Sequence, residues 1–113
     1  TQRKCLHCQK GLVQGEAAFP EAFAEQVRSA LRAAEPLAAL SAPVGSLSGG
    51  GPHMLFAYCP RCKSVGELSL SAAAAGYEFE NLLVLGKSAR MFAYLCEMHE
   101  KVRENRVNNL IGA

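Results

Sequence analysis

The chain has 113 residues, a formal net charge of +2 and five cysteines, and half of its residues are hydrophobic. This length fits a single domain over residues 1–113, and because alanine is frequent and tryptophan absent, a metal crosslink would add usefully to its small core. No apolar run approaches the roughly 20 residues of a membrane span, and the start, TQRKC, lacks the apolar segment of a secretion signal, so we expect a cytoplasmic protein without a membrane partner.

The first half of the chain predicts one helix between a cysteine pair and a linker. The pair is CLHC at residues 5–8, and PEAFAEQVRSALRAA at 20–34 has the apolar spacing of a helix. Pro20 suits the first helical position, and Pro36 ends the helix. The segment at 43–53, PVGSLSGGGPH, has the composition of a flexible linker. The side chains expected on one helical face are Phe23, Val27, Leu31 and Ala34.

The middle of the chain predicts strands. MLFAY at 54–58 and VGELSLS at 65–71 flank the second cysteine pair, and the latter alternates leucine with polar residues. AAAA at 72–75, followed by Gly76, fits one helical turn with a glycine stop. YEFENLLVL at 77–85 predicts a further strand, in which the side chains expected to face one way are Tyr77, Phe79 and Leu83.

The last segment, from Lys87 to Leu110, contains neither glycine nor proline. It predicts one long helix, or a strand MFAYL that turns into a helix near Cys96, and periodicity does not choose between them. Together these elements predict an α+β fold, in which a small antiparallel sheet carries zinc knuckles. One helix is inserted between the knuckles, and a long helix closes the chain.

Two C-x-x-C pairs indicate a metal site. CLHC at 5–8 and FAYCPRC at 56–62 each place two thiols three positions apart, and two such turns can supply the four ligands of a tetrahedral zinc ion. These residues resemble the zinc-ribbon class, in which two knuckles at hairpin tips hold one zinc. The resemblance implies a small sheet and a structural metal. The chain departs from that class in one respect, because 50 residues separate its two knuckles. The predicted ligands are Cys5, Cys8, Cys59 and Cys62.

A second ligand set stays open, because FAYLCEMH at 92–99 echoes the run before CPRC. A knuckle followed by C-x-x-H at the start of a helix resembles the treble-clef class, which implies Cys59, Cys62, Cys96 and His99 as ligands. The simpler interpretation is that Cys96 and His99 line the packed side of a helix. We expect His7, inside the first pair, to be exposed. Zinc and iron both suit four thiolates.

The absence of catalytic patterns favours a binding role over an enzyme. The chain has no aspartate, no phosphate-binding loop and no nucleophile elbow, and a four-thiolate zinc leaves no open coordination position. The basic residues around the two pairs predict a positive surface for nucleic acid or an acidic protein, and no small-molecule substrate is indicated. The predicted contacts are Arg3, Lys4, Lys10, Arg61 and Lys63. Aromatic residues that could stack on bases are few, and the ones expected in the core instead are Phe56, Tyr58, Phe92 and Tyr94.

Two other roles stay open. The C-terminal helix carries an apolar row, so the chain could be an adaptor or a phage-type inhibitor that docks on a protein partner or forms a homodimer. The row consists of Met91, Leu95, Met98 and Val102. Alternatively, the thiols could respond to redox conditions or to metal. C-P-x-C occurs in thiol oxidoreductases, but here a strand-like segment follows it instead of a helix.

Overall fold

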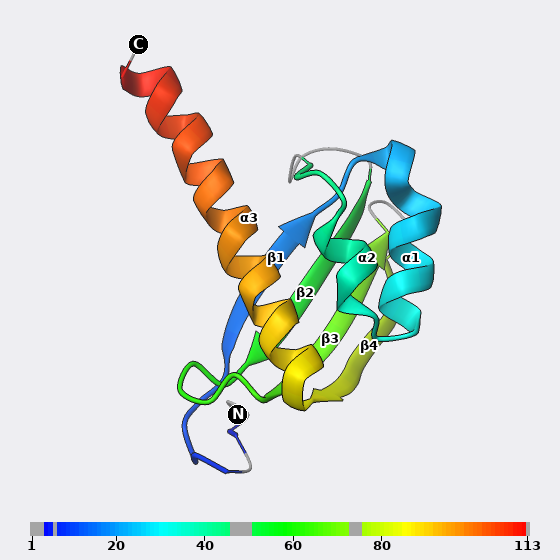
Figure 1. Cartoon of the computed structure of the whole chain (residues 1–113), viewed down its shortest axis with the longest axis vertical. Coiled ribbons are helices and arrows are strands. Elements are labelled where there is room, and N and C mark those ends of the chain that lie inside the picture. Colours follow the sequence, from blue (N-terminus) through cyan, green and yellow to red (C-terminus); the bar gives the residue numbers. More distant parts are fainter. Residues whose placement is uncertain (1–3, 6, 46–50, 73–75, 113) are drawn as a thin grey trace.

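The computed structural model describes residues 4–5, 7–45, 51–72 and 76–112, with the backbone alone described for 72 and 106–112. Four antiparallel strands form one sheet in the order β1-β2-β3-β4, and helices cover one of its faces (Figure 1). The predicted α+β class is therefore confirmed. In chain order the elements are β1 (Val13–Ala18), the 3-10 turn η1 (Glu21–Phe23), α1 (Ala24–Arg32), α2 (Pro36–Leu40), β2 (Pro52–Tyr58), β3 (Val65–Ala72), β4 (Gly76–Leu85) and α3 (Gly86–Gly112).

Alternation along the central strands separates the covered face from the open one. In β2 every second side chain is buried, and Met54, Phe56 and Tyr58 point toward the helices. Leu68 and Leu70 of β3 lie opposite Phe56 and Met54 and are also fully buried. This pattern is the period of two that a strand with one buried face requires. The main core therefore lies between the sheet and the helices.

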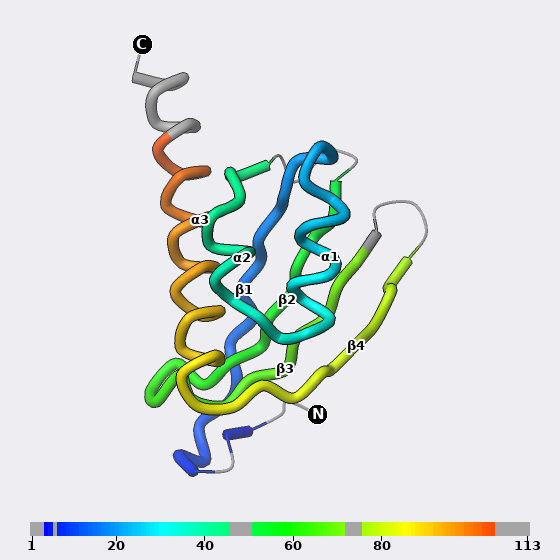
Figure 2. The backbone as a smooth tube through the Cα atoms, turned by 45° about the vertical axis from the view of Figure 1, so that its right-hand side comes forward, coloured from blue at the N-terminus to red at the C-terminus, as the bar shows by residue number. Residues whose placement is uncertain are grey.

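Two groups of helices complete this core on the same face of the sheet. Val27 and Leu31 of α1 are fully buried in the main core, as the helical spacing at 20–34 predicts. The expectation that Phe23 shares their face is wrong, because Phe23 lies in η1 and is exposed. α1 ends at Arg32. Ala34 has a φ of 54°, and Pro36 begins α2. The first half of α3 packs across the sheet, and its second half extends beyond it (Figures 1 and 2). A short helical pair and one long helix thus share the same face of the sheet.

The segment expected to be a linker is partly structural. Gly51 and Gly45 are buried against the backbone of Phe19 and Pro20, and a Cβ added at residue 51 would lie 1.9 Å from the carbonyl oxygen of Phe19. β2 already begins at Pro52, so the strand is longer than 54–58. Residues 46–50 lie outside the described residues. Of the helical turn predicted at 72–75, Ala72 belongs to β3, and 73–75 lie outside the described residues.

The expectation that Tyr77, Phe79 and Leu83 face one way is wrong. Register shifts interrupt the β3–β4 pairing, and Asn81 has a φ of 58°. Phe79 lies opposite buried Leu70 and packs on the core, whereas Tyr77 and Leu83 are exposed. Each extra residue in one strand reverses the face of the next side chains. The strand therefore changes phase, and the sequence pattern carries no clear signal of this.

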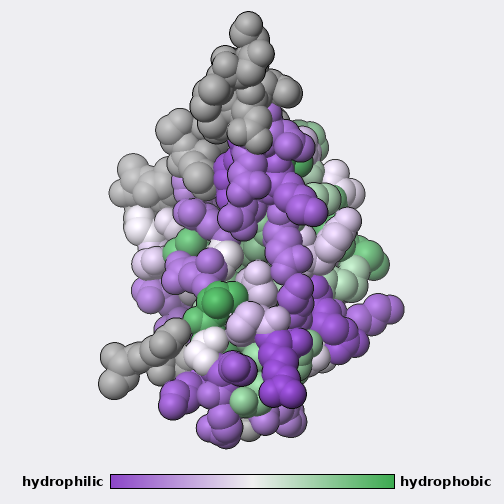
Figure 3. Space-filling model, turned by 90° about the vertical axis from the view of Figure 1, so that its left-hand side faces the viewer, coloured by the Kyte–Doolittle hydropathy of each residue, from purple (hydrophilic) through white to green (hydrophobic). Residues whose placement is uncertain are grey.

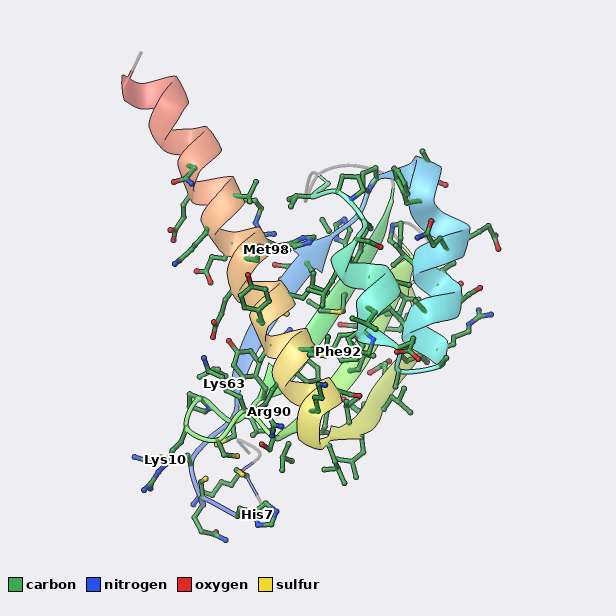
Figure 4. All side chains as sticks on the ribbon, in the orientation of Figure 1. His7, Lys10, Lys63, Arg90, Phe92 and Met98 are labelled. Atoms are coloured by element: carbon green, nitrogen blue, oxygen red, sulfur yellow. The ribbon has the colours of Figure 1, made fainter. Side chains whose placement is uncertain are left out.

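α3 is one continuous helix from Gly86, so the alternative of a strand MFAYL is wrong. Phe92 and Leu95 are fully buried, and Figure 4 shows Phe92 between α3 and the sheet. The expectation that Tyr94 is a core residue is also wrong, because 59% of it is exposed. Helical periodicity turns residue 94 away from the side that carries residues 92 and 95. The similarity between FAYC and FAYLC is thus one of sequence only, because the first lies at the end of a strand and the second within a helix.

Candidate metal centre

The four cysteines of the two C-x-x-C pairs lie together at one end of the sheet. The Sγ atoms of Cys5, Cys8, Cys59 and Cys62 all lie within 4.8 Å of one another, and those of Cys5 and Cys62 are 3.7 Å apart. Figure 4 shows these sulfur atoms at the lower end of the molecule, beside His7 and Lys10. Four sulfurs at this spacing can surround a single metal ion in a tetrahedron. The residues present therefore fit a four-thiolate metal site.

Both pairs fold into the same local turn. The backbone N–H of Gln9 donates to the carbonyl of Cys5 at 3.1 Å, and that of Lys63 donates to the carbonyl of Cys59 at 3.0 Å. Gln9 and Lys63 have φ values of 58° and 54°, a left-handed conformation that non-glycine residues adopt only when held there. The turn directs backbone N–H groups toward sulfur, and that of Cys8 lies 3.5 Å from Cys5 Sγ. Two matching turns thus aim four sulfurs at one point.

We call residues 4–11 and 59–64 the knuckle tip. A small hydrophobic cluster, separate from the main core, joins its two halves: Cys5 and Cys59 pack with Val65, and Leu12 and the other two cysteines lie against them. This cluster has only three buried members. The bridge between Lys4 and Gly11 and the local turns connect residues within the N-terminal half and do not attach it to the second half. A bound metal would therefore be the main crosslink between the two halves.

The thiols have unequal acidities. Burial opposes ionisation of Cys59, but the backbone N–H groups of Cys62 and Arg61, with the neighbouring thiols, outweigh it and lower its pKa to about 6. For Cys8, burial among the other three sulfurs raises the pKa to about 12. Cys59 can thus bind a metal cation as a thiolate, whereas the cation must displace the proton of Cys8.

Ser64 connects the knuckle tip to the rest of the fold. Its Oγ donates to the carbonyl of Cys62 at 3.1 Å and accepts from Arg90 Nη1 at 2.9 Å. Its carbonyl accepts the N–H of Gly86 at 2.8 Å. These bonds attach the second knuckle to the junction of β4 and α3. No cysteine or basic pattern in the sequence marks this residue as part of the site.

Cys96 and His99 lie in α3, away from the knuckle tip. Within the described part of the chain, one group of three or more potential ligands lies close enough to hold a metal ion. It consists of Cys5, Cys8, Cys59 and Cys62, and it includes neither Cys96 nor His99. Cys96 packs against Gly15 of β1, and a Cβ added at Gly15 would lie 2.6 Å from the Cβ of Cys96. Burial raises the pKa of Cys96 to about 12. His99 is fully buried, with its ring edge-on to Phe19 at 5.2 Å. Both residues serve the packing of α3.

The predicted basic contacts divide into two groups. Lys4, Lys10 and Arg61 are exposed, and the last two line one depression of about 410 Å³ with Pro60. Lys63, by contrast, forms an ion pair with Glu97 of α3, with 2.7 Å between Nζ and Oε1. Arg3 lies outside the described residues. The sequence analysis missed the ion pair, because residue 97 lies 34 positions further along the chain.

The apolar row of α3 faces the protein itself. Leu95 is fully buried and Met98 packs against the main core, while Met91 and Val102 are half-buried. The outward side of the helix is largely hydrophilic (Figure 3).

Among the described residues, no helix combines the length and apolarity needed to cross a membrane. Comparisons of the chain with protein-family models, with curated proteins and with solved structures found no match, so its likeness to zinc ribbons rests on the knuckle residues alone.

Proposed function

We propose that this chain is a non-enzymatic binding module, in which a structural zinc joins the two knuckles and presents a basic surface to nucleic acid. The observation that carries this proposal is the convergence of the four Sγ atoms within 4.8 Å. Four thiolates complete the tetrahedral coordination of zinc and leave no position for water or substrate. The metal then holds two loops in place, and those loops carry the exposed cations.

The chemistry of the knuckle tip supports an ionic partner. Lys10 and Arg61 come from different knuckles, and both line the same depression. None of the exposed large hydrophobic residues lies among the described residues of the tip, although protein interfaces usually include such side chains at their centre. A phosphate backbone needs only suitably placed cations and solvent-accessible donors. These features favour nucleic acid over an acidic protein surface.

Charge reversal at the tip tests this proposal. We expect Lys10→Glu and Arg61→Glu each to weaken binding of a mixed-sequence DNA duplex at least about tenfold at low salt, because each removes a phosphate contact and adds a repulsive charge. The slope of log K against log salt should fall by about one for each lost contact. Fluorescence anisotropy with a labelled 20-base-pair duplex, roughly two helical turns, measures both quantities.

The matched control is Lys101→Glu, since Lys101 is an exposed lysine of α3 outside the tip. It changes the net charge by the same amount and should leave most of the affinity intact. Each variant must retain its metal, which metal analysis checks. Equal losses for all three variants would mean that only net charge matters. No salt-dependent binding in the wild type, with binding to a polyglutamate peptide instead, would replace nucleic acid by an acidic protein partner.

A further inference from the structure

The two edges of the sheet differ in how they are covered. Along β1, α3 packs against the strand, and Arg103 Nη2 donates to the backbone carbonyl of Glu16 at 3.2 Å. β4 pairs with β3 alone, and no described segment lies beyond its outer edge (Figure 2). An uncovered edge presents unpaired N–H and C=O groups that can pair with another extended chain. β4 is therefore the edge of the sheet that is open to a partner strand.

The end of β4 carries leucines on both of its faces. Leu82 lies opposite buried Leu68 on the helix side, yet 36% of it is exposed. Leu83 lies opposite Glu67 on the other side and is 56% exposed, and Leu85 is 55% exposed. The first two leucines and Phe79 help to line a groove of about 620 Å³ beside the strand. Consecutive exposed leucines on an open edge are unusual on a protein surface that stays in water.

Left-handed residues delimit the part of β4 that can pair. Asn81 has a φ of 58°, and its N–H donates to the Oγ of Ser69 instead of a strand carbonyl. Gly86, with a φ of 67°, ends the strand where α3 begins. Between them, the residues 82–85 pair regularly with β3. Bulges protect an edge strand from pairing, and here they leave only this four-residue segment available.

The shape of this segment favours a foreign peptide over a second copy of the chain. In an antiparallel two-fold pairing of β4 with itself, residues 82–85 would lie opposite the same four residues of the copy, and Asn81 would lie opposite the copy's Gly86, so that the pairing could not extend further. Both residues have backbones that depart from the extended form. A four-residue overlap also falls well short of the 1,200–2,000 Å² that a stable interface buries. A peptide that binds weakly and transiently needs no interface of that size.

The charges beside the groove indicate what that peptide carries. Arg32 and Glu78 line the groove and pair with each other at 3.5 Å, and Arg28 Nε also reaches Glu78 at 3.1 Å. Glu80 lines the same groove, is exposed, and forms no ion pair among the described residues. An acidic side chain beside leucines selects a partner with a basic residue next to apolar ones.

We propose that the 82–85 edge of β4 binds an extended segment of another protein, in which apolar side chains alternate and a lysine or arginine faces Glu80. The partner segment adds a strand to the sheet. Its backbone supplies the hydrogen bonds, its apolar side chains cover Leu83 and Leu85 or enter the groove beside Leu82, and its cation pairs with Glu80. This surface is separate from the knuckle tip, so the two sites can be tested independently.

Selection from a random octapeptide library displayed on phage, with the metal-loaded full chain as target, tests this proposal. We expect the enriched peptides to alternate apolar residues and to carry a lysine or arginine. Their affinity, measured by anisotropy with synthetic copies, should fall at least about tenfold in Leu83→Asp. The matched control is Tyr94→Asp, because Tyr94 is also an exposed large hydrophobic residue but lies on α3, away from β4. It should leave binding unchanged.

Glu80→Lys provides a second variant that touches no buried residue. Selection against it should enrich acidic peptides in place of basic ones. The proposal is overturned if no enriched peptide loses affinity in Leu83→Asp, or if the preferred charge is the same for Glu80→Lys as for the wild type. Light scattering that shows a dimer dissociated by Leu83→Asp would also overturn it, because the occupant of the edge would then be a second copy.

Discussion

Removal of the metal with a chelator is expected to unfold the knuckle tip while the helix-covered sheet stays folded. Structural zinc contributes about 10–16 kcal/mol to the folding of small zinc peptides at neutral pH, and the small cluster of Cys5, Cys59 and Val65 offers little to replace it. The main core contains none of the four clustered cysteines. Two regions of one chain should therefore respond differently.

Hydrogen exchange of the amides measures this difference. The amides of Cys5, Gln9 and Lys63 donate hydrogen bonds within the tip, and they should lose their protection when the metal is removed. The amides of Met54 and Leu68, in the central strands, should keep most of theirs. Adding zinc back should restore protection, whereas adding magnesium should not, because magnesium prefers oxygen ligands. Equal loss throughout the sheet would show instead that the tip and the core unfold as one unit.

Replacement of Phe92 by alanine is expected to lower the free energy of unfolding by about 3–5 kcal/mol, the usual cost of removing a buried aromatic side chain. Phe92 is fully buried, and its ring lies 5.6 Å from that of Phe56 in the middle of the core. A protein of this size has about 5–15 kcal/mol of net stability, so much of it would be lost. Urea unfolding of the metal-loaded protein, followed by circular dichroism, measures the change.

Tyr94→Ala is the matched control for this substitution. Tyr94 lies on the same helix two positions further on, but 59% of it is exposed, so its replacement should change the free energy of unfolding by no more than about 0.5 kcal/mol. Similar losses for Phe92→Ala and Tyr94→Ala would contradict the orientation of α3 on the sheet. The metal content of both variants should equal that of the wild type.

Much of the fold can be predicted from the sequence, because its signals are local. The alternation in GELSLS and the helical spacing of Val27 and Leu31 depend on neighbouring residues and on period alone. β4 is different, since its phase change depends on Asn81 adopting a left-handed conformation that its N–H bond to Ser69 supports. A bond between residues twelve positions apart leaves no mark in a hydrophobic pattern.

The candidate site divides in the same way. Two C-x-x-C pairs identify four candidate ligands, because zinc chemistry constrains their spacing, and the structure brings those four sulfurs together. The competing set with Cys96 and His99 depended on a resemblance between FAYC and FAYLC. Only the packing of α3 decides whether residues in such a run face the metal or the core. The ion pair of Lys63 with Glu97 likewise follows from the tertiary fold.

The most direct test of the four-cysteine metal site is the metal content of freshly purified protein, measured by mass spectrometry for the wild type, Cys5→Ser and Cys96→Ser. The four-cysteine site predicts about one zinc per chain in the wild type, its loss in Cys5→Ser and its retention in Cys96→Ser. Iron in place of zinc would keep the site and change its metal. Retention in Cys5→Ser with loss in Cys96→Ser, or no metal in any of the three proteins, would mean that these four cysteines do not form a metal site.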